Sequence, residues 1–109
     1  MTRSVMDEIK EEVQSHPVVI YMKGTRTAPQ CGFSAAAIQV LEQYQVPVKD
    51  VNILADQEKW AALKVYSNWP TMPQIYIGGE FVGGSDILKE MHGKGEIALL
   101  IQKATAAKS

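Results

Sequence analysis

The sequence predicts a single α/β domain over residues 1–109, with a four-stranded mixed sheet flanked by about five helices. In the first half of the chain, short apolar runs alternate with helical patterns, as in a β-α-β unit with parallel strands. In the second half, two apolar runs flank a Gly-Gly pair, which is typical of an antiparallel hairpin. With 46% hydrophobic residues, a chain of this length can bury one modest core.

The first half predicts a helix, a strand, a second helix and a second strand. Apolar residues at helical spacing between glutamates predict an amphipathic helix over 3–15, which Pro17 ends. The apolar run 18–22 is rich in β-branched residues and is typical of a strand buried on both faces. After a polar loop, we expect a helix over 32–45 and a strand over 48–53.

The second half predicts one helix, the hairpin and two final helices. Asp56 is a residue type that caps helices, and acidic residues near it favour a first turn. Gly78 and Gly79 suit the positive φ angles of a two-residue hairpin turn. The expected ranges are 56–66 for the helix, 73–77 and 80–83 for the strands, and 86–91 and 96–104 for the last helices. The closing AAKS segment is expected to fray.

Composition excludes several classes of function. The formal net charge is -1, from 11 basic and 12 acidic side chains, so we expect no bulk attraction to nucleic acid or to a membrane surface. The longest apolar runs are far shorter than the roughly 20 residues that span a bilayer. The acidic N-terminal region lacks an apolar signal core, so we expect a mature intracellular domain. The single cysteine excludes an internal disulfide and fits a reducing compartment.

That cysteine, Cys31, is a candidate reactive thiolate. It follows the first predicted strand and begins the second predicted helix, where free N–H groups and the helix dipole stabilise an anion and lower a thiol pKa. Lys23 and Arg26 in the preceding loop are expected to add positive potential, and Gly32 to leave room for a bulky sulfur ligand. On position alone, a role as a small buried hydrophobic residue is an equal alternative.

Four segments around these positions resemble the monothiol glutaredoxins of the CGFS type, a family with the thioredoxin fold. The segments are KGT, CGFS, WPTMPQIYI and GGEFVGGSD, in the family's order and spacing, and the resemblance extends from about Met6 to Leu99. It implies a thioredoxin-like fold and a [2Fe–2S] cluster that is ligated by Cys31 and glutathione and delivered to acceptor apoproteins. It also implies a homodimer when the cluster is loaded, and complexes with BolA-like proteins. A bacterial cytoplasm and a mitochondrial matrix both fit.

The resemblance further implies a glutathione site built from separate segments. The Met72–Pro73 bond is implied to be cis, with the Met72 backbone pairing with the cysteinyl part of glutathione. Backbone N–H groups at Ser85 and Asp86 are implied to hold the γ-glutamyl carboxylate. Lys23 is implied to pair with the glycine carboxylate. The predicted glutathione-binding residues are Lys23, Cys31, Gly32, Phe33, Lys64, Met72, Pro73, Gly84, Ser85 and Asp86.

One position departs from the family pattern. Many members have an arginine in the third helix that helps to bind the glycine carboxylate, and Trp60 occupies that position here. Lys64 lies one turn further along the same helix face and is the nearest substitute, as a point charge without bidentate geometry. Lys59 lies about 100° around the helix and is a poorer candidate. A larger glutathione-like thiol therefore stays an alternative ligand.

Other notable residues have ordinary structural explanations. Ser34 stands where two-cysteine relatives have a second thiol; its hydroxyl cannot attack a mixed disulfide, and we expect a hydrogen bond within the first helical turn. Phe33 is expected beside the site or in the core, and Trp69 is expected to pack rather than to contact a ligand. The remaining polar candidates are expected on the solvated surface: His16, His92, Glu8, Glu11 and Glu12.

Three functions remain open from the sequence. The favoured one is an iron–sulfur carrier or scaffold, because one thiolate per chain and four ligands per cluster require two chains and two external thiols. The second is a glutathione-dependent oxidoreductase with Cys31 as sole nucleophile, which measured deglutathionylation with turnover would identify. The third is a binding module with an inert cysteine, whose thiol pKa would lie near or above about 8.5.

Overall fold

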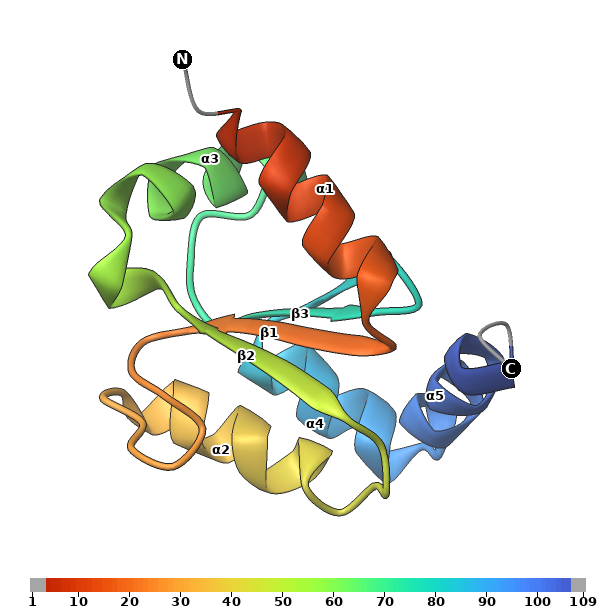
Figure 1. Cartoon of the computed structure of the whole chain (residues 1–109). Coiled ribbons are helices and arrows are strands. Elements are labelled where there is room, and N and C mark those ends of the chain that lie inside the picture. Colours follow the sequence, from red (N-terminus) through yellow and green to blue (C-terminus); the bar gives the residue numbers. More distant parts are fainter. Residues whose placement is uncertain (1–3, 107–109) are drawn as a thin grey trace.

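The computed structural model describes residues 4–106 and contains a four-stranded sheet with helices on both faces (Figure 1). This confirms the predicted α/β fold with five α-helices. The elements are α1 (Val5–Ser15), β1 (Val18–Met22), α2 (Gly32–Leu41), β2 (Val48–Asn52), the 3-10 helix η1 (Ile53–Ala55), α3 (Gln57–Ser67), β3 (Gln74–Ile77), β4 (Glu80–Gly83), α4 (Ser85–Gly93) and α5 (Glu96–Ala106). The predicted helix start at residue 3 and the predicted fraying of residues 107–109 lie outside the described residues, within which α1 begins at Val5 after the N-cap Ser4 and α5 continues through Ala106.

The sheet has the strand order β2-β1-β3-β4. Strand β1 pairs in parallel with β2 and antiparallel with β3, and β3 pairs antiparallel with β4. Gly78 and Gly79 join β3 to β4 with φ angles of 63° and 84°, so the predicted hairpin turn is confirmed. Because β1 lies inside the sheet, all five of its residues are buried, as the continuous apolar run predicts.

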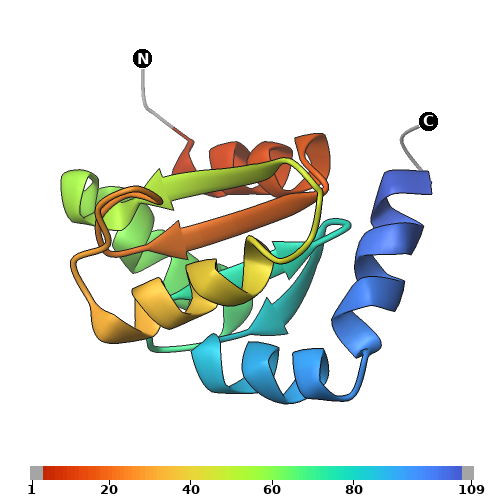
Figure 2. The same ribbon diagram turned by 90° about the horizontal axis from the view of Figure 1, so that it is seen from below.

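Side chains of β1 alternate between two apolar clusters, one on each face of the sheet. Val18, Ile20 and Met22 join the cluster that α2, α4 and α5 cover. Val19 and Tyr21 join the cluster beneath α1 and α3. Figure 2 shows α2 and α4 side by side on one face of the sheet, with α5 beside the turn between β3 and β4.

Several boundaries differ from the predicted ones, for local reasons. Helix α2 ends at Leu41 and not at Gln45, because the N–H groups of Gln43 and Tyr44 donate to carbonyls three residues back and tighten the chain into a turn. Strand β2 ends at Asn52, whose side chain accepts from the N–H of Leu54 and caps η1. Helix α4 begins at Ser85, one residue before the predicted start.

Candidate functional site

Cys31 lies at the N-cap of α2, just beyond the loop that follows β1. The N–H groups of Ser34 and Phe33, together with the Ser34 hydroxyl and the charge of Lys23, lower the pKa of the Cys31 thiol, and the Ser34 N–H contributes most. Burial opposes this effect, but Cys31 is only half-buried. The thiol is therefore poised to ionise, as its position at a helix start predicts, and it is not part of the buried core.

A cavity of about 450 Å³ opens beside Cys31. It brings together residues from the loop after β1, the starts of α2 and α4, helix α3 and the segment before β3. All the predicted glutathione-binding residues except Gly32 line it. The lining residues are Lys23, Cys31, Phe33, Trp60, Lys64, Trp69, Pro70, Thr71, Met72, Pro73, Gly84, Ser85, Asp86 and Ile87.

Positive charge enters the cavity from two elements. Lys64 lies on α3, and Lys23 follows β1. Their ammonium groups lie 5.8 Å and 5.4 Å from the centre of the Trp60 ring, within cation–π distance. This part of the cavity is suited to a carboxylate.

The start of α4 forms another part of the wall, through Gly84, Ser85 and Asp86. Unpaired N–H groups at a helix start attract anions. The hydroxyl of Ser85 is buried and has no hydrogen-bond partner among the described residues. A ligand carboxylate would satisfy these donors.

The segment between α3 and β3 completes the wall, and its Met72–Pro73 bond is cis, as the resemblance implies. Gln74 directly follows it and is fully buried. Its amide donates to the Trp69 carbonyl at 3.0 Å and accepts from the Tyr76 hydroxyl at 3.1 Å. These bonds tie the segment to the sheet, a positioning role that the sequence alone did not indicate.

The loop before Cys31 is held by hydrogen bonds to β2. The N–H of Gly24 donates to Asn52 Oδ1 at 3.0 Å, and the N–H of Arg26 donates to Asp50 Oδ2 at 2.9 Å. The Arg26 guanidinium pairs with Glu42 at 3.5 Å and does not line the cavity. The prediction that Arg26 adds positive potential at Cys31 is therefore wrong, because its charge is directed toward α2.

Gly32 also differs from expectation. A Cβ at this position would meet nothing within 4 Å, and the residue is not part of the cavity wall. The expectation that Gly32 leaves room for a sulfur ligand beside Cys31 stays a prediction. Phe33 is 61% exposed beside Cys31, which excludes the core alternative for its ring.

Ser34 and Trp69 have wider roles than expected. The Ser34 hydroxyl, fully buried, acts on Cys31 within the helical turn but also accepts from the N–H of Lys23 at 3.2 Å. Trp69 packs against Phe81, with ring centres 5.8 Å apart, and also lines the cavity. Its indole N–H is buried without a partner among the described residues.

Sequence reasoning did not assign Trp69, Pro70, Thr71 or Ile87 to the cavity wall, and it considered Trp60 only as the residue in place of an arginine. For the segment 69–71 the signal was available, because these residues belong to the same WPTMP motif as Met72 and Pro73. Ile87 lies in the first turn of α4, and only the folded helix shows that it reaches the cavity.

Residues 18–82 match the glutaredoxin family. The chain belongs to this family, in its monothiol branch. It is 54% identical over 96 residues to the mitochondrial monothiol glutaredoxin-S15 of Arabidopsis thaliana, covering 88% of this chain and 57% of that protein. It is 44% identical over 103 residues to glutaredoxin 4 of Haemophilus ducreyi, covering 94% and 95%. The solution structure of reduced poplar apo GrxS14 matches with a TM-score of 0.84 at 44% identity, covering 94% of each chain.

The glutaredoxin thus spans little more than half of the Arabidopsis relative's length. These relatives come from a mitochondrion and from a bacterium, the two settings considered from the sequence, and further relatives are chloroplastic. Within residues 4–106, no helix is long and apolar enough to cross a bilayer.

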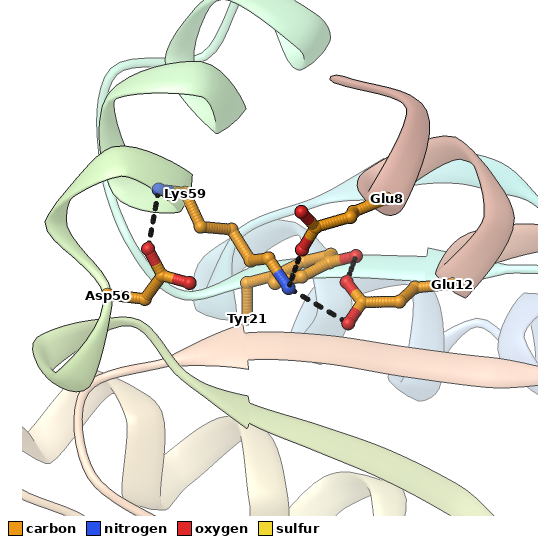
Figure 3. Close-up of polar contacts among 5 residues, drawn as sticks. All are labelled: Glu8, Glu12, Tyr21, Asp56 and Lys59. Carbon is orange, nitrogen blue, oxygen red and sulfur yellow. Dashed lines mark hydrogen bonds and ion pairs between the residues drawn. The ribbon is translucent and has the colours of Figure 1, made fainter. Parts of the chain in front are cut away.

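One face of helix α1 in this glutaredoxin carries a charged network in place of the predicted solvated glutamates (Figure 3). The ammonium of Lys59 lies 2.9 Å from Glu12 and 3.7 Å from Glu8. Tyr21 donates its hydroxyl to Glu12 at 2.7 Å. The prediction is therefore wrong for Glu8 and Glu12, because their partners come from distant segments; Glu11 is exposed as predicted. Lys59 points away from the cavity, as its helical position predicts.

The histidines also differ from the surface prediction. His92 is half-buried, and its Nδ1 lies 2.5 Å from the Tyr44 hydroxyl, which connects α4 to the turn after α2. His16 is half-buried at the end of α1. Neither lines the cavity beside Cys31.

Proposed function

We propose that this glutaredoxin binds glutathione beside Cys31 and carries a [2Fe–2S] cluster, held between two chains, to acceptor apoproteins. The observation that supports this most strongly is the meeting of a thiol of lowered pKa with a cavity that has anion-binding groups in two separate places. The cavity volume of about 450 Å³ falls in the range of small-ligand sites.

Glutathione has a carboxylate at each end, and the cavity offers a partner for each. The glycine carboxylate suits Lys23 and Lys64, which have no ion pair with a carboxylate among residues 4–106. The γ-glutamyl carboxylate suits the start of α4, where the Ser85 hydroxyl is buried without a partner. The backbone of Met72 borders the same space and suits the cysteinyl part between them.

Cluster binding follows from counting ligands. A [2Fe–2S] cluster takes four ligands, usually thiolates. The chain has one cysteine, and no group of three or more potential metal ligands occurs in the described residues. Two chains supply two Cys31 thiolates, so two further thiols must come from bound glutathione. Because those two ligands can dissociate, the cluster is suited to be cargo for transfer.

The partners implied by this function are a second copy of the chain, BolA-like proteins and iron–sulfur acceptor apoproteins. The exposed Phe33 ring beside Cys31 gives such partners an apolar contact next to the thiol. Their identities rest on the resemblance to the CGFS glutaredoxins.

The lowered pKa of Cys31 also favours a second candidate, deglutathionylation. The Cys31 thiolate would attack the glutathione sulfur of a protein mixed disulfide, forming a Cys31–glutathione disulfide and releasing the protein thiolate. A second glutathione thiolate would then attack this disulfide, releasing glutathione disulfide and restoring Cys31. Turnover with a glutathionylated protein would identify this activity. A lowered pKa disfavours the third hypothesis, an inert cysteine.

Anaerobic reconstitution with iron and sulfide tests the carrier function. The parent and Cys31→Ser are compared with and without glutathione, by visible absorbance and iron content. We expect a coloured protein with about one iron per chain only when both Cys31 and glutathione are present. A colourless parent under every condition would overturn the carrier proposal and leave the oxidoreductase to be tested.

A further inference from the structure

Trp60 lies beside both lysines of the cavity. The ammonium of Lys23 lies 5.4 Å from the centre of its ring, and that of Lys64 lies 5.8 Å away. Both distances are within the roughly 6 Å over which an aromatic ring attracts a cation. Within residues 4–106, no carboxylate forms an ion pair with either lysine. The Trp60 ring therefore attracts both ammonium groups before a ligand binds.

The ring is well supported for this task. Trp60 is half-buried and packs against the apolar cluster beneath α1 and α3, a cluster that includes Met72 of the cavity wall. Lys64 follows Trp60 by one helical turn, and the N–H of Lys23 is bonded to the buried Ser34 hydroxyl. The ring thus lies near two long, flexible side chains from different elements, and both side chains line the same cavity. Ordering these side chains before a ligand arrives lowers the entropic cost of binding.

We propose that Trp60 is a specificity-determining residue, whose ring holds Lys23 and Lys64 as a paired receptor for one free carboxylate. The site would then select peptide thiols with a free carboxylate at the glycine end over thiols in which that group is esterified, amidated or absent. This inference rests on the glutathione binding proposed above. It goes further because it attributes the preference for a free carboxylate to Trp60, an uncharged aromatic side chain.

The test follows one exchange reaction at Cys31. The Cys31 thiolate attacks glutathione disulfide, the S–S bond breaks, a Cys31–glutathione disulfide forms and one glutathione thiolate leaves. Rates are compared for glutathione disulfide, for the same disulfide esterified at both glycine carboxylates, and for bis(2-hydroxyethyl) disulfide. The last has no carboxylate for a lysine to bind, so it reports whether each variant keeps an intact, reactive thiol.

We expect the parent to prefer the free acid to the ester. In Trp60→Leu, the ratio of the free-acid rate to the ester rate should fall about fivefold, because losing an exposed cation–π contact changes an affinity by a factor of about two to five. Trp60→Phe keeps a ring and should retain most of it. Lys64→Gln should lower the preference for the free acid. Adding Trp60→Leu to Lys64→Gln should reduce this preference by a smaller factor than Trp60→Leu does in the parent, because the two residues share one interaction. Lys94→Gln removes a lysine of α4's C-terminal end and should behave as the parent.

The outcomes separate this inference from the proposed function. If glutathione disulfide reacts no faster than bis(2-hydroxyethyl) disulfide in the parent, the proposed glutathione site fails, and the inference with it. If the parent prefers the free acid but Trp60→Leu keeps the full preference, only the inference is overturned. Trp60→Met serves in the same comparison if the leucine variant does not fold.

Discussion

The ammonium of Lys59 lies 2.9 Å from the carboxylate of Glu12 and joins α3 to α1 on the sheet face opposite α2 and α4 (Figure 3). The Lys59 side chain is 8% exposed, so its charge is largely removed from water and needs this partner. Tyr21 donates to the same carboxylate, and burial, reinforced by Glu12, raises the pKa of Tyr21. The phenol therefore remains a donor at neutral pH.

We predict that Lys59→Met lowers the free energy of unfolding by about 2 kcal/mol, since it leaves a half-buried Glu12 oxygen without its charged partner. Denaturant unfolding measures this change. Adding Glu12→Gln should recover part of the loss, because the uncompensated charge is then also removed. Lys94→Met breaks an exposed pair on α4 and serves as the control, with nearly unchanged stability expected. Equal losses for Lys59→Met and Lys94→Met would contradict the buried network.

The second prediction concerns the thiol. Because the pKa of Cys31 is lowered, its alkylation by iodoacetamide should rise with pH, with a midpoint below the free-thiol value of about 8.5. Lys23→Gln removes a positive charge that stabilises the thiolate, so the midpoint should move upward and the rate at pH 7 should fall. Lys64→Gln is the matched control and should leave the midpoint unchanged, as Lys64 is not among the groups that shift Cys31. A parent midpoint at or above about 8.5 would be inconsistent with a poised thiolate.

The third prediction concerns the loop before Cys31. Gly24 has a φ of 91°, and a Cβ there would lie 2.6 Å from Ala28 O and from Gln30 N. We expect Gly24→Ala to destabilise the protein by at least about 1 kcal/mol, because both the backbone angle and the space are unsuitable. Gly93→Ala has open space at the end of α4 and should be neutral or stabilising by about 0.5–1 kcal/mol. Thermal unfolding of the pair tests this, and indistinguishable melting temperatures would refute the constraint at Gly24.

The fourth prediction concerns Gln74. Gln74→Leu leaves the Trp69 carbonyl and the Tyr76 hydroxyl without their buried partner, so we expect a loss of about 2 kcal/mol in unfolding free energy. Exchange of Cys31 with glutathione disulfide should slow as well, because the cavity wall shifts. Gln43→Leu removes an exposed hydrogen bond, which the Gln43 side-chain amide donates to the Gln39 carbonyl. It should change neither the unfolding free energy nor the exchange rate. A Gln74 variant with parent exchange rates would show that the wall does not depend on this amide.

The sequence was sufficient for elements that depend on local patterns. The buried run of β1, the hairpin at Gly78 and Gly79 and the cap at Asp56 follow from period, turn chemistry and capping, and the structure contains all three. The position of Cys31 at a helix start likewise follows from neighbouring residues. Helical spacing also indicated that Lys64, and not Lys59, faces the site.

Features that depend on distant segments could not be predicted in the same way. Lys59 meets Glu12 across 47 positions of sequence, and no local pattern contains that pairing. The direction of Arg26 is set by Asp50 and Glu42, which the fold brings to the loop. The contact of Lys23 with Trp60 likewise requires β1 and α3 to be placed first. Ion pairs and cation–π contacts between distant segments are thus features that only the folded chain shows.

The central claim is that two Cys31 thiolates and two glutathione molecules together hold one cluster. Native mass spectrometry of the anaerobically reconstituted protein tests it most directly. The account predicts one main species, with the mass of two chains, one [2Fe–2S] unit and two glutathione molecules, which is lost in Cys31→Ser. A cluster bound to a single chain, or to two chains without glutathione, would contradict it.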